Sequence, residues 1–353
     1  MKLARVRGNF FEDFALGQRI RHGTPRTVSD GEAAVYTALT GSREAAPSAT
    51  TTARLCGLPA RSVDDWLVFN IAFGRTVPDI SQNALANLGY AEVRFLRPVF
   101  AGATLRCESL IIGMREVSDG RAGIVYVRST CLDENDRPVL SWIRWVMVPK
   151  RATDQWSDAP VSPELLAVVP AELIETAVLF ATDKALDDWC EATACRKVWD
   201  DYEIGDRIEH PAGMTIEEAD HMTAARLYQN NAQVHFVAAT RSDDKACRRL
   251  VYGGHVISVC YALSHTGLEN RVHVAAVNSG RHTAPVFAGD VLHAVSKVVD
   301  RLAIPHRSDV GLLRLRLVGV KNVAAEEIDV ESPGHPAIVL ELDHSVVMPR
   351  RQR

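Results

Sequence analysis

The apolar and polar residues of this chain form two similar series of predicted elements. Residues 27–33 and 215–221 each combine an apolar strand end with Ser or acidic side chains, which is typical of the first turn of a helix. The pattern therefore predicts two short helices, which end near Leu39 and Leu227.

A longer apolar run follows each short helix. The stretch from Gly254 to His265 is mostly apolar and too long for one strand, so it predicts a helix that is buried on nearly all sides. Its counterpart in the first series is expected within residues 63–73. Residues 74–89, which are rich in polar and turn-forming side chains, are interpreted as an insertion.

Alternating apolar and polar residues predict several strands after each buried helix. In the first series the predicted strands cover residues 89–95, 104–110, 123–129 and 139–145. A curved antiparallel sheet wrapped around the buried helix is the compact arrangement of these elements. The fold class is therefore expected to be α+β.

Two separated motifs recur along the chain at nearly the same offset. Residues 13–22 (DFALGQRIRH) reappear as residues 201–210 (DYEIGDRIEH), and residues 97–105 (RPVFAGATL) reappear as residues 284–292 (APVFAGDVL). Internal similarity of this kind is the mark of a duplicated unit. The chain is therefore predicted to contain two copies of one domain in tandem.

The predicted domain limits follow from the repeat. The first domain covers residues 1–151, a linker with helical pieces covers residues 152–196, and the second domain covers residues 197–353. The two sheets are expected either to join in one continuous sheet or to pack back to back.

Composition narrows the classes of partner. The formal net charge of −4 gives no reason to expect a nucleic acid or an anionic membrane. No run approaches about 18 apolar residues, so we expect neither a signal peptide nor a membrane span, and we expect a cytoplasmic protein.

The seven Cys are scattered without a Cys-x-x-Cys, which argues against disulfides and a zinc site. No metal, flavin or nicotinamide motif is visible.

The densest polar cluster is residues 228–236 (YQNNAQVHF), which contains two Asn, two Gln and one His. The aligned segment of the first copy, residues 40–47 (TGSREAAP), has neither His nor amide. An imidazole can take and return a proton near neutral pH, and amides can hold a water molecule. His235 is therefore the candidate for chemistry, against the alternative of an ordinary surface or core histidine.

The order of short helix, polar loop ending in an aliphatic residue and His, buried helix and Pro-Val-Phe-Ala-Gly resembles the MaoC-like acyl-CoA hydratases of the hotdog fold. The resemblance covers nearly the whole chain twice, as in double-hotdog members, and it is closest to the mesaconyl-CoA hydratase group. The segments that carry this closer resemblance are residues 8–14, 34–39, 74–81, 87–92, 94–99 and 229–236.

This resemblance implies a hydro-lyase that adds water to an enoyl-CoA, converting mesaconyl-CoA into β-methylmalyl-CoA. The second domain would be catalytic, and the first would form a wall for the substrate. No cofactor is implied beyond the coenzyme A of the substrate. A homodimer or a higher homo-oligomer is expected.

The family motif, Gly-Asp-x-Asn-Pro-aliphatic-His, places its histidine at His235. The Asp of the motif falls at Asn230 and its Asn at Ala232, so this chain lacks the family carboxylate. An Asn cannot act as a base, which leaves the second catalytic role open. Asn230, Asn231 and Gln233 are expected to hold the water or orient the imidazole.

The resemblance also implies a group that stabilises the enolate oxygen and a group that binds the substrate carboxylate. Backbone N–H donors at the start of a buried helix suit the enolate, so Gly254 is the first candidate and Gly253 the second, against the alternative of a tight turn alone. An Arg suits the carboxylate. Arg226, Arg281 and Arg94 are the candidates, and the residues do not rank them.

Three alternatives stay open at this point. A hotdog thioesterase would need a carboxylate in the active loop, where this chain has Asn230. A non-catalytic acyl-CoA-binding protein would explain the missing Asp. A hydratase for another acyl group, such as a fatty enoyl-CoA, would keep the chemistry and change the substrate.

Overall fold

The computed structural model describes residues 8–151, 156, 158–238, 248–328 and 334–351. The first half contains η1 (Phe11–Asp13), β1 (Arg19–Arg21), β2 (Arg26–Thr27), α1 (Asp30–Thr40), α2 (Ala45–Ser48), α3 (Thr50–Leu55), α4 (Asp65–Ile80), β3 (Ala86–Phe95), β4 (Thr104–Glu116), β5 (Ala122–Leu132) and β6 (Pro138–Pro149). The connecting segment contains η2 (Ala171–Leu173) and α5 (Asp183–Ala192). The second half contains η3 (Trp199–Asp201), β7 (Arg207–Thr215), α6 (Glu218–Leu227), η4 (Gln233–His235), α7 (Gly253–Leu263), β8 (His273–His282), β9 (Val291–Ala303), β10 (Val310–Lys321), η6 (Ala325–Glu327) and β11 (Ile338–Pro349).

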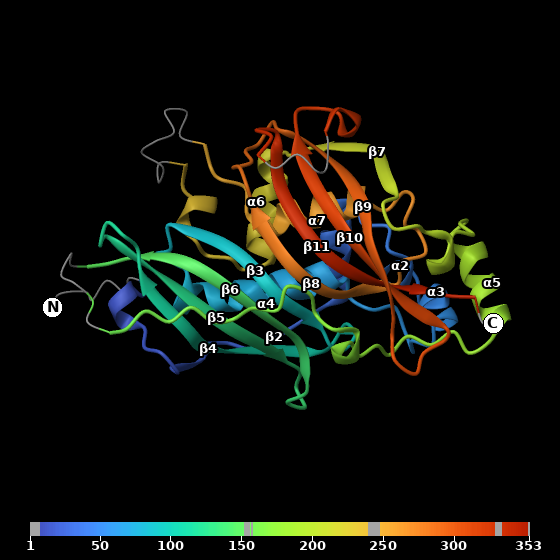
Figure 1. Ribbon diagram of the computed structural model, residues 1–353, viewed down its shortest axis with the longest axis horizontal. Helices are drawn as coiled ribbons and strands as arrows, with labels where there is room; N and C mark the ends of the chain where they lie inside the picture. The colour runs from blue at the N-terminus through green and yellow to red at the C-terminus, as the bar shows by residue number, and fades with distance from the viewer. Residues whose placement is uncertain (1–7, 152–155, 157, 239–247, 329–333, 352–353) are drawn as a thin grey trace.

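The described strands of both halves join in one antiparallel sheet in the order β1-β4-β5-β6-β3-β8-β11-β10-β9-β7, with β2 paired to β4 (Figure 1). The order on one side of the β3–β8 pair mirrors the order on the other side. At this joint Tyr90 lies opposite Gly280 and Arg94 lies opposite Ala276. The sheet is therefore continuous, which decides between the two arrangements that the repeat left open.

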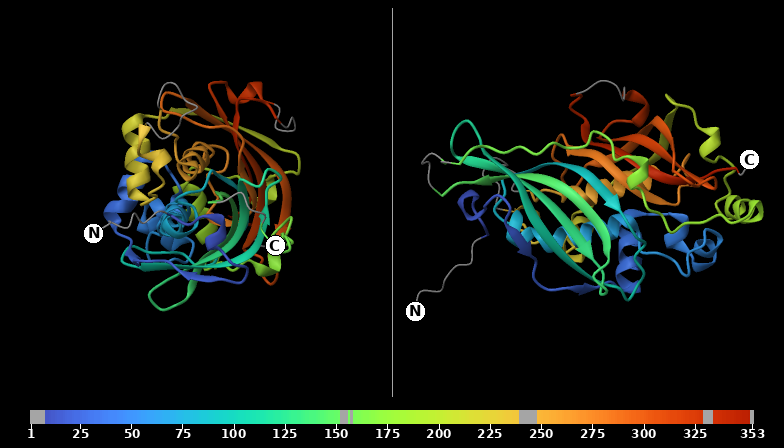
Figure 2. Two further views of the ribbon diagram at one scale, coloured as in Figure 1. Left: turned by 90° about the vertical axis from the view of Figure 1, so that its left-hand side faces the viewer. Right: turned by 60° about the horizontal axis from the view of Figure 1, so that its bottom comes forward.

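The sheet curves around the two long helices α4 and α7 (Figure 2). The helices contact each other at a polar point, where Asn70 Nδ2 donates a hydrogen bond to Ser258 Oγ at 2.9 Å. Nearly every residue of α7 is buried, as the apolar run predicted. The α+β prediction of a sheet wrapped around a central helix is confirmed in each half.

The short helices α1 and α6 also occur where the pattern predicted them. Ser29 caps α1 by accepting from the Glu32 N–H at 3.2 Å, while the Glu32 carboxylate accepts from the Ser29 N–H at 2.7 Å. This reciprocal pair satisfies two helix N–H groups that otherwise lack partners. Gly41 ends α1 in the left-handed conformation, with φ of 67°.

The interpretation of residues 74–89 as an insertion is wrong for residues 74–80, which continue α4. The helix persists because Thr76, Val77 and Ile80 are buried. Gly74 looks like a turn residue, but it is needed where the Tyr228 carbonyl oxygen approaches the helix so closely that a Cβ would collide with it. Burial against the other half therefore outweighs the local turn signals.

The connecting segment packs against the second half through its own apolar side chains. Phe180 and Trp189 are fully buried, in a cluster with Val272 and Val347. The predicted helical pieces are η2 and α5. The limits of the two domains and of the linker stay a prediction, since the continuous sheet does not divide the chain.

Three further findings concern only the described part of the chain. No helix there is long and apolar enough to cross a membrane. Six cysteines are free thiols, and Cys247 lies outside the described residues. No three His, Cys, Asp or Glu side chains gather there in a way that could hold a metal ion.

Candidate active site

A cleft of about 670 Å³ lies beside the β3–β8 joint, and both halves of the chain line it. From the first half come residues of α4, the start of β3 and one residue of β6. From the second half come the polar loop after α6, the start of α7 and the segment that follows β8. The lining side chains with polar atoms are Ser81, Asn87, Tyr90, Arg144, Asn230, His235, Tyr252, His282 and Thr283.

His235 lies in this cleft at the end of η4. Its Nδ1 is 2.8 Å from the Leu250 carbonyl oxygen. Because a carbonyl only accepts, Nδ1 carries the proton and Nε2 keeps its lone pair. Burial lowers the pKa of His235 to about 4. The imidazole is therefore neutral at pH 7 and can accept a proton at Nε2.

The polar loop separates its amides into two groups. Asn230 is buried in the cleft, and its Oδ1 accepts from the Ala232 N–H at 3.1 Å, which shapes the turn before His235. Asn231 and Gln233 are exposed and do not line the cleft. The structure thus brings Asn230 and His235 together, and it does not bring Asn231 and Gln233 to them.

The N-terminus of α7 forms another part of the cleft. Gly253 lines the cleft, whereas Gly254 lies behind it, with its carbonyl 3.3 Å from Asn70 Nδ2. A Cβ at Gly253 would lie 2.5 Å from Nε2 of His282, so any side chain there would displace that imidazole. No side chain caps this helix, because the N-cap residue Tyr252 makes no capping hydrogen bond. The first N–H groups of α7 are therefore available to a bound ligand.

The three predicted arginines lie elsewhere. Arg226 is exposed on α6 and donates to the Met222 carbonyl at 3.2 Å. Arg281 forms an ion pair with Glu341. Arg94, on β3, does not line the cleft either. The prediction that one of these residues meets a substrate in this cleft is therefore not supported by their positions.

The family follows from comparison with known proteins. The family model described as mesaconyl-CoA hydratase matches residues 2–322. The chain belongs to the mesaconyl-CoA hydratase family. It is 48% identical over 347 residues to the beta-methylmalyl-CoA dehydratase of Chloroflexus aurantiacus, with 98% of both chains covered. It is 47% identical over 346 residues to the mesaconyl-CoA hydratase of Cereibacter sphaeroides, with 97% of this chain and 98% of that one covered.

Solved structures agree with this membership of the mesaconyl-CoA hydratase family. A MaoC domain protein dehydratase from Chloroflexus aurantiacus superposes with a TM-score of 0.94 at 46% identity, covering 99% of this chain and 100% of that one. A Mycobacterium tuberculosis protein described as a double hotdog fold gives a TM-score of 0.75 at 26% identity, covering 98% and 99%. The predicted double hotdog fold and MaoC-like family are confirmed.

In this member of the mesaconyl-CoA hydratase family, the cleft contains seven polar residues that the sequence analysis did not assign to the site. They are Ser81, Asn87, Tyr90, Arg144, Tyr252, His282 and Thr283. Both amide atoms of Asn87, Nε of Arg144 and Oη of Tyr252 are buried without a hydrogen-bond partner among the described residues. Buried polar atoms are rarely left unpaired, so these four atoms at the cleft are available to a bound ligand or water.

His282 brings a second imidazole to the cleft. Loss of hydration lowers its pKa to about 4, so it too is neutral at pH 7. Its Nε2 is 3.5 Å from the Tyr90 hydroxyl. The repeat could have indicated His282, because it lies three residues before the recurring Pro-Val-Phe segment, where the first copy has Phe95.

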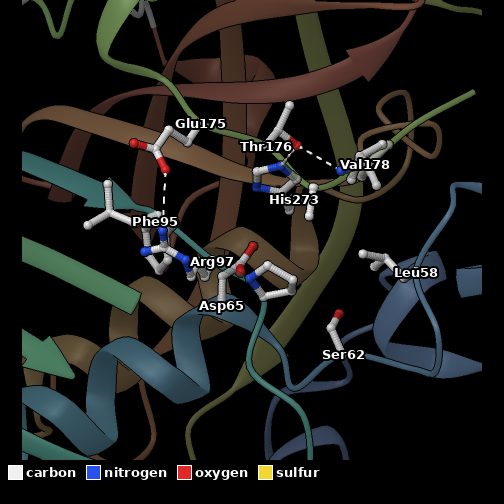
Figure 3. A pocket seen from close by; sticks show the side chains of 13 residues that line it. Leu58, Ser62, Asp65, Phe95, Arg97, Glu175, Thr176, Val178 and His273 are labelled. Carbon is white, nitrogen blue, oxygen red and sulfur yellow. Dashed lines mark hydrogen bonds and ion pairs between the residues drawn. The ribbon is translucent and has the colours of Figure 1, made fainter. Parts of the chain in front are cut away.

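The other half of the mesaconyl-CoA hydratase fold has an equivalent pocket of only about 20 Å³ (Figure 3). It lies at the end of β3 and the start of α4, where Phe95 and Asp65 take the places of His282 and Gly253. Residues 175–178 of the connecting segment line it. Thr176 Oγ1 is 2.8 Å from Nε2 of His273, and Glu175 lies 3.8 Å from Arg97. The linker therefore packs against the counterpart of the cleft and forms part of its wall.

Proposed function

We propose that this protein is a hydro-lyase that adds water reversibly across the double bond of mesaconyl-CoA to form β-methylmalyl-CoA. The observation that carries the proposal is a buried, neutral His235 beside the uncapped start of α7, in one cleft. The names of both close relatives support the same reaction and substrate.

The mechanism uses His235 for both proton transfers. Its Nε2 removes a proton from a water molecule, and the hydroxide adds to the β-carbon of the enoyl thioester. The electron pair of the double bond moves onto the thioester oxygen as an enolate. The imidazolium of His235 then returns the proton to the α-carbon, and the enolate collapses to the thioester. Because burial lowers the pKa of His235 to about 4, its protonated form is a stronger acid than an ordinary imidazolium, which favours this return.

The enolate oxygen meets the first N–H groups of α7. The backbone of Gly253 borders the cleft without a side chain in the way, and the helix dipole adds partial positive charge at this end. Donors of this kind are worth about 10²–10³ in rate where they have been removed from other enzymes. Asn230 keeps the loop in the turn that presents His235, through its bond to the Ala232 N–H.

The thioesterase alternative is disfavoured by the side chains of the cleft. Water activated for attack on a thioester carbonyl would need a carboxylate nearby, and no Asp or Glu is among the described residues that line the cleft. The non-catalytic alternative does not account for an imidazole that lies in the same cleft as the uncapped start of α7, with its Nδ1 held by the Leu250 carbonyl.

Absorbance of the enoyl thioester tests the proposed reaction directly. The purified protein is mixed separately with mesaconyl-CoA and with crotonyl-CoA, and free thiol is measured in the same samples. We expect the absorbance of mesaconyl-CoA to fall to an equilibrium value without thiol release. Thiol release in step with the absorbance change would mean thioesterase activity, and no change with either substrate would reject the hydratase.

The resemblance also supports proposals about the cofactor requirement, the cellular compartment and the oligomeric state of the protein. We infer that the reaction needs no cofactor besides the coenzyme A of the substrate, that the protein acts in the cytoplasm, and that it forms a homodimer or a higher homo-oligomer. Activity after dialysis against a chelator and the mass in solution by light scattering test the first and third of these features.

A further inference from the structure

We infer that Arg144 binds the free carboxylate of the acyl group and thereby selects dicarboxylic acyl thioesters. This inference deepens the proposed function, since mesaconyl-CoA carries such a carboxylate on its β-carbon. The residue lies on β6 of the first half, the half without His235. The catalytic histidine and the selecting arginine would thus come from different copies of the repeat.

Arg144 is a buried cation whose known partners are neutral. Its side chain has no exposed surface, and its two terminal nitrogens donate to Thr76 Oγ1 at 2.9 Å and to Ser81 Oγ at 3.3 Å. The guanidinium carbon lies 4.1 Å from the centre of the Phe73 ring. Nε has no partner, and no carboxylate of the described residues pairs with the group. Arg144 is one of the residues that line the cleft, so an anion bound there would supply the missing counter-ion.

A second fully buried arginine among the described residues, Arg271, has the contacts of a structural ion pair. Nε of Arg271 is 3.0 Å from both carboxylate oxygens of Glu44. Burial opposes the charge of Arg271, but Glu44 outweighs burial and raises the pKa. For Arg144 burial lowers the pKa to about 10, so the group stays charged at pH 7 without a counter-ion. The fold pairs one of these cations internally and leaves the other for a ligand.

Aromatic rings connect Arg144 to the catalytic histidine along the wall of the cleft. The His235 and Tyr252 rings are 5.5 Å apart, the Tyr252 and Phe73 rings are 5.9 Å apart, and Arg144 lies over Phe73. An apolar acyl chain fits such a wall, with the thioester at Gly253 and the carboxylate at Arg144. The carbon that receives the hydroxide would then lie between these ends, beside His235.

Binding of two saturated thioesters tests this inference independently of turnover. Succinyl-CoA and butyryl-CoA have acyl chains of equal length, and only the first has a free carboxylate. In calorimetric titrations we expect Arg144→Met to weaken succinyl-CoA about 100-fold, as expected for the loss of a charged, hydrogen-bonded partner, and butyryl-CoA less than about threefold. Arg226→Met, which removes an exposed arginine outside the cleft, is the matched control and should leave both affinities unchanged.

Thermal unfolding separates a binding role from a structural one. Because Arg144→Met removes a buried charge that has no counter-ion, its Tm should equal or exceed that of the wild-type protein. Arg144→Lys keeps the charge but loses the planar guanidinium, which can bind a carboxylate in two places. It should therefore weaken the binding of succinyl-CoA about tenfold and leave the binding of butyryl-CoA unchanged. This second variant decides the question if Arg144→Met does not fold.

Equal loss of affinity for both thioesters, or no loss for either in Arg144→Met or Arg144→Lys, would overturn the inference. Failure of the proposed function looks different. In that case the wild-type protein would leave the absorbance of mesaconyl-CoA unchanged, whatever Arg144 does to the binding of succinyl-CoA.

Discussion

The two equivalent pockets of this fold differ at their helix starts. Asp64 caps α4, accepting from the Trp66 N–H at 2.9 Å, and the neighbouring Asp65 accepts from the Val274 N–H at 2.8 Å. The equivalent positions of α7 are Tyr252, which makes no capping bond, and Gly253, which has no side chain. One helix start is satisfied by the chain itself, and the other is left available to a ligand.

The two pockets also differ in what lines them. Thr176 and its neighbours in the connecting segment line the small pocket. The large cleft is bordered by polar atoms of Asn87, Arg144 and Tyr252 that lack partners among the described residues. The backbone framework is the same in both. Function therefore depends on which polar groups each copy leaves without a hydrogen-bond partner, and the fold alone does not determine it.

The largest effect should come from exchanging the histidines of the two pockets for glutamine. In His235→Gln we expect kcat/KM for mesaconyl-CoA to fall about 10³-fold, because the group that moves both protons is lost. The matched control is His273→Gln in the small pocket, where the imidazole bonds Thr176, and its kcat/KM should stay within about twofold. Initial-rate absorbance assays measure kcat/KM of both variants. Equal losses in the two variants would contradict the assignment of the active pocket.

A smaller effect is expected on the free energy of unfolding, which should distinguish the two buried arginines, Arg271 and Arg144. In Glu44→Gln the guanidinium of Arg271 loses its counter-ion inside the protein, so the free energy of unfolding should fall by about 3 kcal/mol. Arg144→Met, which leaves no buried charge behind, serves as the comparison and should lose none. Urea denaturation at pH 7 measures both. A loss below about 1 kcal/mol in Glu44→Gln would mean that the two cations are not distinguished as we infer.

The smallest effect that we expect is the change of kcat/KM between pH 8 and pH 5.5. The neutral form of His235 is the base, and its pKa is lowered to about 4, so kcat/KM should stay within about twofold over this range and fall only as the pH approaches 4. At the N-cap of α4, burial raises the pKa of Asp64 to about 6. Because Asp64 does not line the cleft, no inflection near pH 6 is expected. A midpoint near 6 in the pH profile, with the circular dichroism unchanged, would contradict this assignment.

Much of the fold was predictable because the repeat and the periodicity agree. The capping residues located α1, and the long apolar run located α7. The second half of α4 was not predictable, since Gly74 and Pro78 are turn-forming residues by local rules. Only contact with the other half, where the Tyr228 carbonyl lies against Gly74, shows why the helix continues. Local signals therefore failed where a long-range contact decides.

The site was predictable in part for a similar reason. His235 was found because the polar loop is present in one copy and absent from the other. Arg144 was missed because the alternation predicted for residues 139–145 assigns a charged side chain to the outer face of the strand, whereas Trp142, Ile143 and Arg144 are all buried. The location of the predicted arginines outside the cleft shows that residue type alone does not identify a binding group.

The single connecting segment has a consequence for stoichiometry. A pair of identical, separate domains would carry two equal grooves related by symmetry. Here one tether, residues 175–178, reaches one groove and cannot reach the other at the same time. Tethering thus makes the two grooves of the described chain unequal, and we expect one substrate site per chain of 38.8 kDa. This expected stoichiometry is set by the covalent connection and does not depend on ligand concentration.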